Sequence, residues 1–296
     1  MTSKTSRILL TGSNGQVGRA LRQTLAPLCT VVALSRDALD LADPDAIRKT
    51  VRDSQPTLII NAAAYTAVDR AESEPELAMA VNGIAPGILA EEAKRLKVAL
   101  VHYSTDYVFD GTKASAYTEA DIPNPLNVYG KTKLAGEQAI QAVNAAHYIL
   151  RTSWVYAAEG ANFLNTILRL ARERPELRIV DDQVGAPTWA HAIADMTAQL
   201  LASTSIKSAD PQHGLYHLTA SGATTWFGFA QAILVEAEKT LHITAPRLLP
   251  IKTADYPLPA KRPANSRLDT ARLASAFGIK PAPWKKMLEQ CMREKA

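Results

Sequence analysis

The chain has 296 residues and a formal net charge of +4, with 47% hydrophobic and 21% charged residues. This composition is that of an ordinary globular protein with one large domain or two unequal ones, long enough to bury a core without metals or disulfides. Its basic residues are scattered rather than grouped in blocks with interleaved aromatics, so we expect no nucleic-acid surface.

Cysteine usage and hydrophobic runs bear on the compartment. Only Cys29 and Cys291 occur, near opposite ends of the chain, which excludes a disulfide scaffold and cysteine-ligated zinc and fits a reducing environment. The first residues, MTSKTSRILLTG, lack the apolar core of a signal peptide. No run approaches the roughly 20 apolar residues of a membrane span. We therefore expect a soluble cytoplasmic protein without membrane contact.

Strand and helix patterns alternate through residues 1–155. Short aliphatic or β-branched runs predict strands at Arg7–Leu10, Val31–Leu34, Leu58–Asn61, Ala99–Ser104 and Tyr148–Thr152. Apolar residues at helical spacing predict helices at Gln16–Ala26, Pro44–Asp53, Pro75–Leu96 and Val128–Val143. This order predicts an α/β fold, a doubly wound, Rossmann-like parallel sheet, with residues 1–155 as a dinucleotide-binding domain.

The pattern is looser after residue 155. Helices are predicted at Asn162–Arg174, from Trp189 onward, at Trp226–Lys239 and at Trp284–Met292, and a strand at Gly214–Thr219. The proline-rich segment from Pro246 to Pro263 reads as a wrapping loop. We expect residues 156–296 to form mainly a smaller substrate-binding lobe, with segments that return to the first domain.

A glycine-rich loop follows the first predicted strand and opens the first helix. Gly12, Gly15 and Gly18 give the spacing GxxGxxG. Glycines at such a turn let the backbone approach a pyrophosphate, and the helix N-terminus supplies N–H groups and a favourable dipole. The pattern alone is common, but its place between a strand and a helix favours nucleotide binding.

The residues at the end of the second predicted strand indicate whether the cofactor is NADH or NADPH. NAD-preferring sites usually place an acid there against the ribose 2′-hydroxyl. Here the sequence has Ser35 and Arg36, and a guanidinium can pair with a 2′-phosphate. We therefore expect NADPH, while Asp37, one residue further on, keeps NADH possible.

A third group of residues points to proton transfer. Tyr129 and Lys133 lie four apart on a predicted helix, which puts their Cβ atoms about 5–6 Å apart on one face. An adjacent ammonium favours the phenolate, so we expect Lys133 to lower the pKa of Tyr129 toward a useful range. Thr105, at the end of the fourth strand, can hydrogen-bond the same carbonyl oxygen that Tyr129 protonates. The alternative is a pair with no catalytic role, an exposed tyrosine beside a solvated lysine.

These motifs resemble the short-chain dehydrogenase/reductase superfamily in its extended, nucleotide-sugar form. Longer stretches strengthen the resemblance through nearly the whole chain, toward the reductases that form dTDP-L-rhamnose. They are NAAAYTAVD from Asn61, HYSTDYVF from His102, PLNVYGKTK from Pro125, RTSWVY from Arg151, DQVGAPT from Asp182 and RPANSRLD from Arg262.

The resemblance implies a role for each matching position. Tyr129 would donate the proton, Lys133 would hold the nicotinamide ribose, and Thr105 would assist at the sugar oxygen. The implied cofactor contacts are Gly15, Gln16 and Val17 under the pyrophosphate, Asp40 and Leu41 beside the adenine, and Ala64, Tyr65, Thr66 and Tyr103 along the cleft. The implied substrate contacts are Thr105, Asp106 and Trp154.

The resemblance also implies a reaction and leaves alternatives open. The reaction is NADPH-dependent reduction of the C4 ketone of dTDP-6-deoxy-L-lyxo-4-hexulose to dTDP-L-rhamnose, by a monomer or homodimer. A 4,6-dehydratase or epimerase of the same fold is one alternative, although Asp106 is followed by Tyr107 and not by the glutamate typical of the dehydratases. A non-catalytic NADP-binding regulatory subunit is another.

One departure from the family concerns metal. Some members form magnesium-linked dimers whose metal is held by glutamates, and the matching positions here are Ala20 and His191. Neither side chain is a carboxylate, so we expect no metal site, and magnesium dependence is in doubt.

Overall fold

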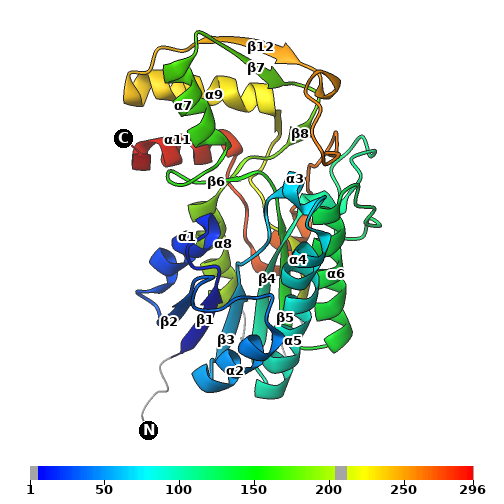
Figure 1. Cartoon of the computed structure of the whole chain (residues 1–296). Coiled ribbons are helices and arrows are strands. Elements are labelled where there is room, and N and C mark those ends of the chain that lie inside the picture. Colours follow the sequence, from blue (N-terminus) through cyan, green and yellow to red (C-terminus); the bar gives the residue numbers. More distant parts are fainter. Residues whose placement is uncertain (1–5, 204–211, 296) are drawn as a thin grey trace.

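Six parallel strands form the central sheet of the computed structural model, which describes residues 6–203 and 212–295 (Figure 1). Their spatial order is β10 (Gly214–His217), β5 (His147–Thr152), β4 (Ala99–Thr105), β3 (Leu58–Asn61), β1 (Arg7–Thr11) and β2 (Thr30–Leu34). Each neighbouring pair is parallel. The predicted doubly wound sheet is confirmed; residues 1–5, part of the segment tested for a signal peptide, lie outside the described range.

Successive residues of a strand point to opposite faces of the sheet. Here the residues on both faces are apolar, and helices cover both faces. Leu9, Ile59 and Leu100 pack with α2 (Pro44–Ser54), α5 (Ala85–Leu96) and α6 (Val128–Val143). Leu10, Ile60 and Val101 pack on the other face with α1 (Gln16–Leu25) and α8 (Ala190–Ser203). Strands buried on both faces read as continuous apolar runs, which explains why the sequence revealed them.

The helix predicted over Pro75–Leu96 is interrupted, so that prediction is wrong in one respect. The short α3 (Val68–Ala71) is followed by α4 (Pro75–Met79), a π-helical turn η1 (Ala80–Ile84) and then α5. Within the turn, Asn82 accepts a hydrogen bond from the Tyr65 amide (2.8 Å) and donates one to the Tyr65 carbonyl (3.0 Å). Hydrophobic spacing does not reveal a π turn, because the apolar face continues through it.

The second half of the chain supplies an upper lobe and several returning segments (Figure 1). The lobe contains α7 (Phe163–Glu173), α9 (Trp226–Leu241) and α11 (Trp284–Lys295), with β7 (Glu176–Val180) parallel to β12 (Arg247–Ile251). Short pairs join β6 (Val155–Tyr156) to β9 (Thr188–Trp189) and β8 (Val184–Gly185) to β11 (Thr224–Thr225). The remaining elements are η2 (Asp106–Val108), η3 (Thr253–Asp255) and α10 (Ala271–Phe277).

The segment Pro246–Pro263, predicted as a loop, begins with the strand β12, so that prediction is corrected there. Pro250 lies within β12. A proline is tolerated because each strand of a two-stranded sheet has a free edge. The division of the chain at residue 155 stays a prediction. In the described part of the chain, no helix combines the length and apolarity needed to cross a membrane.

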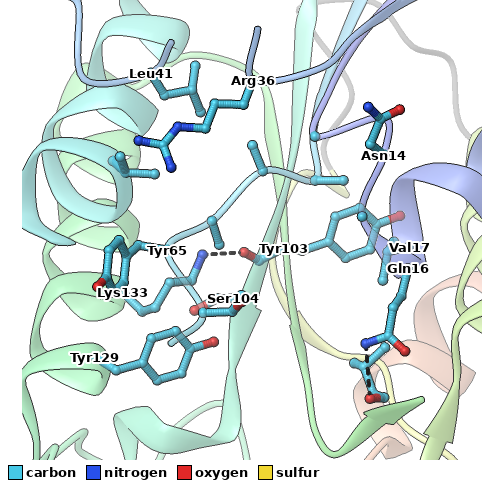
Figure 2. Close-up of a pocket in the computed structure, with 18 of the residues that line it drawn as sticks. Asn14, Gln16, Val17, Arg36, Leu41, Tyr65, Tyr103, Ser104, Tyr129 and Lys133 are labelled. Carbon is cyan, nitrogen blue, oxygen red and sulfur yellow. Dashed lines mark hydrogen bonds between the residues drawn. The ribbon is translucent and has the colours of Figure 1, made fainter. Parts of the chain in front are cut away.

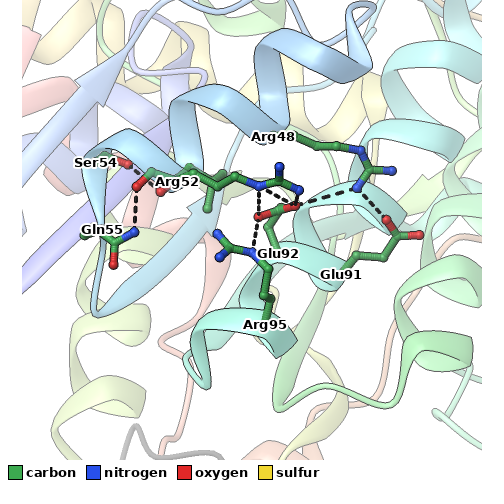
Figure 3. A network of polar contacts seen from close by, with 8 residues as sticks. Arg48, Arg52, Ser54, Gln55, Glu91, Glu92 and Arg95 are labelled. Carbon is green, nitrogen blue, oxygen red and sulfur yellow. Dashed lines mark hydrogen bonds and ion pairs between the residues drawn. The ribbon is translucent and has the colours of Figure 1, made fainter.

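The carboxyl ends of the central strands and the first turns of α6 surround one pocket (Figure 2). Away from it, α2 and α5 are joined by a buried carboxylate (Figure 3). Glu92 is 2% exposed and accepts three hydrogen bonds from Arg52, the shortest 2.6 Å, and one from Arg95 at 2.8 Å. These bonds, Arg52's foremost, lower the pKa of Glu92 despite its burial.

Replacing Glu92 by Gln should lower the free energy of unfolding by about 1–3 kcal/mol, because the charge-assisted hydrogen bonds to the arginines are lost. Its lowered pKa means that this stabilisation is present above the unfolded-state pKa and is lost as pH falls. Urea denaturation of the wild type and of Glu92→Gln, at neutral and at acid pH, measures the difference in the free energy of unfolding. Glu91→Gln is the control, since Glu91 is 51% exposed and pairs with Arg48 at the surface. Equal losses in the two variants would contradict the assignment.

Candidate active site

The pocket lies at the point where the strand order reverses. The chain leaves β1 toward one face of the sheet and β3 toward the other, which opens a crevice at their carboxyl ends. The cavity has a volume of about 500 Å³. Its walls come from the β1–α1 loop, the segment after β2, the segment after β3, the end of β4 and one side of α6.

The glycine-rich loop packs against the segment after β3 with no room for side chains. Gly12 has φ +68°, and a Cβ there would lie 2.5 Å from the Ala63 nitrogen. A Cβ on Gly18 would lie 2.0 Å from the Gly12 carbonyl oxygen. The loop therefore brings bare backbone and the N-terminus of α1 to the cleft, an arrangement that fits a pyrophosphate.

The end of β2 presents a cation to the cleft. Arg36 lines the cavity, whereas Asp37 and Ser35 do not. Figure 2 places Arg36 and Leu41 at one end and Tyr129 toward the other. Of the two residues that sequence left in competition, the arginine borders the cleft, so the wall fits a 2′-phosphate better than a free 2′-hydroxyl.

Tyr129 and Lys133 face the other end of the cleft from α6. Asn127 caps this helix by accepting a hydrogen bond from the Gly130 amide (2.8 Å). Lys133 is 1% exposed, and its Nζ donates to the Tyr103 carbonyl (2.6 Å) and lies 3.2 Å from His102 Nε2. Burial lowers the pKa of Lys133 to about 8.

The pKa expected for Tyr129 is corrected by the structure. Desolvation raises the pKa of Tyr129 to about 12, opposed by a hydrogen bond with Thr105. Lys133 does not lower the pKa of Tyr129 here because its Nζ is directed to Tyr103 and His102. Sharing one helix face was therefore not enough to bring the ammonium to the phenol.

Thr105 and Asp106 lie buried beside Tyr129. The Thr105 hydroxyl donates to Asp106 Oδ1 (2.8 Å) and accepts from the Tyr107 amide (3.1 Å). Burial raises the pKa of Asp106 to about 6, and hydrogen bonds with Ser266 and Thr105 oppose the rise. Thr105 is thus fixed in place next to the tyrosine hydroxyl.

Most of the predicted site residues line the one cavity. They are Gly12, Gly15, Gln16, Val17, Arg36, Asp40, Leu41, Ala64, Tyr65, Thr66, Tyr103, Tyr129 and Lys133. Five predicted residues are not among its lining: Gly18, Ser35, Thr105, Asp106 and Trp154. Gly18 lies beneath the loop, and Thr105 and Asp106 are buried behind Tyr129.

Other residues that line the cavity were not predicted from the sequence. They are Asn14, Arg19, Leu39, Ala62, Ala63, Leu77, Val81, Ser104, Thr152, Val155 and Ala161. Asn14, Ala63 and Ser104 adjoin recognised motifs, so their positions could have been inferred. Leu77 lies on α4 and Val81 on the π-helical turn that follows it, and no motif in the sequence marked this part of the chain as a wall of the cleft.

Trp154 belongs to an aromatic stack rather than to the cavity wall. Its ring lies 3.5 Å from that of Trp226, with 3° between the planes, and its backbone has φ +47°. Gly185 packs against the indole edge, where a Cβ would lie 2.4 Å from Trp154 Cε2. The stack joins the end of β5 to the start of α9.

The residues present do not fit a glutamate-held magnesium ion. Ala20 is buried and offers no ligand, and His191 lies 3.7 Å from Asp195 and 3.9 Å from Glu294. Within residues 6–203 and 212–295, no group of three or more His, Cys, Asp or Glu side chains could hold a metal ion.

A parallel Rossmann-like sheet with a tyrosine and a lysine one turn apart beside the nucleotide cleft defines an extended short-chain dehydrogenase/reductase. The family model described as "RmlD substrate binding domain" matches residues 6–296. The dTDP-4-dehydrorhamnose reductase of Burkholderia thailandensis is 49% identical over 294 residues, covering 97% of this chain and 98% of the relative. The chain therefore belongs to the dTDP-4-dehydrorhamnose reductase family.

Another relative and a solved structure carry the same name. The Escherichia coli K12 enzyme of that name is 44% identical over 292 residues, 97% of each chain. The crystal structure of the Bacillus anthracis dTDP-4-dehydrorhamnose reductase in complex with NADP has a TM-score of 0.90 and 33% identity, covering 98% of this chain and 99% of that chain. A Thermus thermophilus UDP-glucose 4-epimerase in complex with NAD has a TM-score of 0.80 at 20% identity, which shows the shared fold alone.

Replacing Gly185 by Ala should separate the two stacked indoles, because the new methyl group would overlap the Trp154 ring. We expect loss of the exciton signal that coupled tryptophans give in circular dichroism. Trp189→Phe is the control, since Trp189 lies outside this stack and its removal should leave the signal. An unchanged signal in Gly185→Ala would contradict the stacking.

Proposed function

We propose that the protein catalyses NADPH-dependent reduction of the C4 ketone of dTDP-6-deoxy-L-lyxo-4-hexulose to dTDP-L-rhamnose, the final step of dTDP-rhamnose formation, in the cytoplasm. The observation that carries this is the meeting of Tyr129 and Lys133 with a nucleotide cleft, in a chain 49% identical to a dTDP-4-dehydrorhamnose reductase. We infer a monomer or homodimer as the working form.

The cleft residues divide into cofactor contacts along its length. The backbone of Gly12 and Gly15, with Gln16 and Val17, would hold the pyrophosphate at the start of α1. Arg36 would pair with the 2′-phosphate, and Asp40 and Leu41 would lie against the adenine. The remaining contacts along the cleft would be Ala64, Tyr65, Thr66 and Tyr103.

Tyr129 and its neighbours would act at the sugar carbonyl. When bound, NADPH supplies the hydride that reduces the carbonyl carbon. Tyr129, with its pKa raised to about 12, is protonated at neutral pH and can give its proton to the developing alkoxide. Thr105 would turn its single hydroxyl proton from Asp106 to the same oxygen, and Lys133 would hold the nicotinamide ribose as an ammonium donor. Positioning and charge stabilisation at that oxygen would carry the rate.

The substrate would enter from the side of the upper lobe. Asp106 would contact the sugar beside Thr105, and the Trp154–Trp226 stack would offer an apolar ring edge at the end of β5. The alternatives have less support. In place of the glutamate typical of dehydratases stands Tyr107, whose ring packs against Tyr129 at 5.5 Å. A regulatory subunit would not require Thr105, Tyr129 and Lys133 together.

The direct test is NADPH oxidation with enzymatically prepared dTDP-4-keto-6-deoxyhexulose, run with and without EDTA. We expect substrate-dependent loss of the nicotinamide absorbance that survives EDTA, because the residues present do not fit the family's magnesium site. A flat absorbance in a protein that binds NADPH would favour the regulatory reading. Turnover without added NADPH would favour a dehydratase or epimerase.

Tyr129→Phe should lower turnover by about 100-fold or more, because the proton donor is removed. NADPH affinity should stay near that of the wild type, since the ring remains in place. Steady-state kinetics and fluorescence titration of NADPH measure the two effects. Retained turnover would refute the role assigned to Tyr129.

Arg36→Ala should weaken NADPH binding by about 10–100-fold, as expected for loss of a charge-assisted contact to a phosphate. Affinity for NADH, which lacks the 2′-phosphate, should change little. Titration of both cofactors into both proteins gives the comparison. An equal loss for the two cofactors would contradict the 2′-phosphate contact.

A further inference from the structure

A buried line of polar side chains crosses the sheet beneath the cleft and ends at Lys133. Thr11 on β1 donates to Asn61 Oδ1 on β3 (2.7 Å), Asn61 Nδ2 lies 3.0 Å from His102 Nδ1 on β4, and His102 Nε2 lies 3.2 Å from Lys133 Nζ. All four side chains are at most 2% exposed. Groups buried so deeply must satisfy one another, so their donor and acceptor roles can be worked out in turn.

The orientation of the Asn61 amide is fixed by backbone. The amide N–H of Ala63 donates to Asn61 Oδ1 (3.3 Å), as does the Thr11 hydroxyl. A backbone N–H can only donate, so a flipped amide would set N–H against N–H. Asn61 Nδ2 is therefore the atom that faces His102, and it donates to His102 Nδ1.

That donation fixes the tautomer of His102. A ring nitrogen that accepts a hydrogen bond carries no proton, so the proton of the neutral imidazole is on Nε2. Burial holds the pKa of His102 well below its usual range, which keeps the ring neutral. The Nε2–H therefore faces Lys133 Nζ. If Lys133 were an ammonium, its N–H groups would face the Nε2–H of His102, and neither nitrogen could accept a hydrogen bond. A neutral amine at Lys133 can accept from His102 Nε2–H and still donate to the Tyr103 carbonyl.

We propose that His102 is a positioning residue for Lys133: its Nε2–H, directed by Asn61, holds the lysine on the Tyr103 carbonyl and favours the neutral amine in the cofactor-free enzyme. Above the free-enzyme pKa of Lys133, the lysine then takes up a proton when ribose hydroxyls replace these partners. The consequence for cofactor binding rests on the proposed function, whereas the tautomer of His102 does not.

Other groups around Lys133 act on its charge as well. On its own helix, Glu137 raises the pKa of Lys133, but that carboxylate is already bound by Arg151 and Ser104. Tyr129, also on α6, is neutral below its raised pKa. His102 is therefore the neighbouring side chain that opposes the ammonium with an N–H.

Long-range proton–nitrogen NMR of the free protein, labelled with ¹⁵N-histidine, reads the tautomer directly. The chain has six histidines, and the His102 signals are those lost in His102→Met. We expect an unprotonated Nδ1 and a protonated Nε2. In Asn61→Asp the carboxylate accepts instead of donating, so the proton should appear on Nδ1. A protonated Nδ1 in the wild type would overturn the proposal.

The pH dependence of NADPH affinity gives the second readout. Lys133 binds ribose as an ammonium, so affinity should be full below its free-enzyme pKa of about 8 and fall as pH rises through it. In His102→Met and in Asn61→Asp the fall should begin about one pH unit higher, which is roughly tenfold tighter binding than wild type at alkaline pH. A midpoint that does not rise in either variant would overturn the proposal.

His147→Met is the matched control. His147 is also buried, on the neighbouring strand β5, and bonds to the Ala145 carbonyl rather than to Lys133. Its replacement should leave the midpoint unchanged, and a shift equal to that of His102→Met would count against a specific contact. Complete absence of NADPH binding at every pH would refute the proposed function while leaving the NMR result as a separate test.

Discussion

The buried ion pair between Glu137 and Arg151 is the interaction on which the geometry of the site depends. Arg151 on β5 donates to both carboxylate oxygens of Glu137 on α6, at 2.9 and 2.6 Å, and Ser104 donates to the same carboxylate. Leaving either charge unpaired at this depth costs about 3–5 kcal/mol, so a shifted or rotated α6 is strongly disfavoured. Tyr129, Lys133 and Glu137 lie four residues apart in turn, so the ion pair that holds the last of them also aims the other two at the strand ends.

Around this fixed helix, the crevice is shaped by close backbone approach. Gly12 lets the first loop touch the segment after β3, and Asn82 holds Tyr65 of that segment from the π-helical turn. The cleft therefore forms where backbone packing at Gly12 and the Asn82 side chain tie three chain segments together. The chemistry depends on a few side chains. Among them, Lys133 is positioned by its contact with His102.

The sequence predicted the sheet well because buried parallel strands read as short apolar runs, and it predicted most of the cleft because Tyr129, Lys133 and the glycines stand in local motifs. It did not predict the strand β12, since Pro250 reads as loop, or the π turn, since the apolar face continues through it. It also failed for the pKa of Tyr129. Helical spacing gives the face on which Lys133 lies, but which partners its Nζ takes depends on His102 and the carbonyl of Tyr103, which only the folded sheet brings near.

The fate of the transferred hydrogen decides whether the protein reduces the sugar at C4. The protein is incubated with the dTDP-4-keto-6-deoxy sugar and NADPH deuterated at nicotinamide C4, each diastereomer in turn, and the product is examined by NMR. We expect one deuterium at C4 of dTDP-L-rhamnose with one of the two cofactors, and unlabelled C4 with the other. A sugar product without deuterium at C4 in both reactions would refute hydride transfer to that carbon.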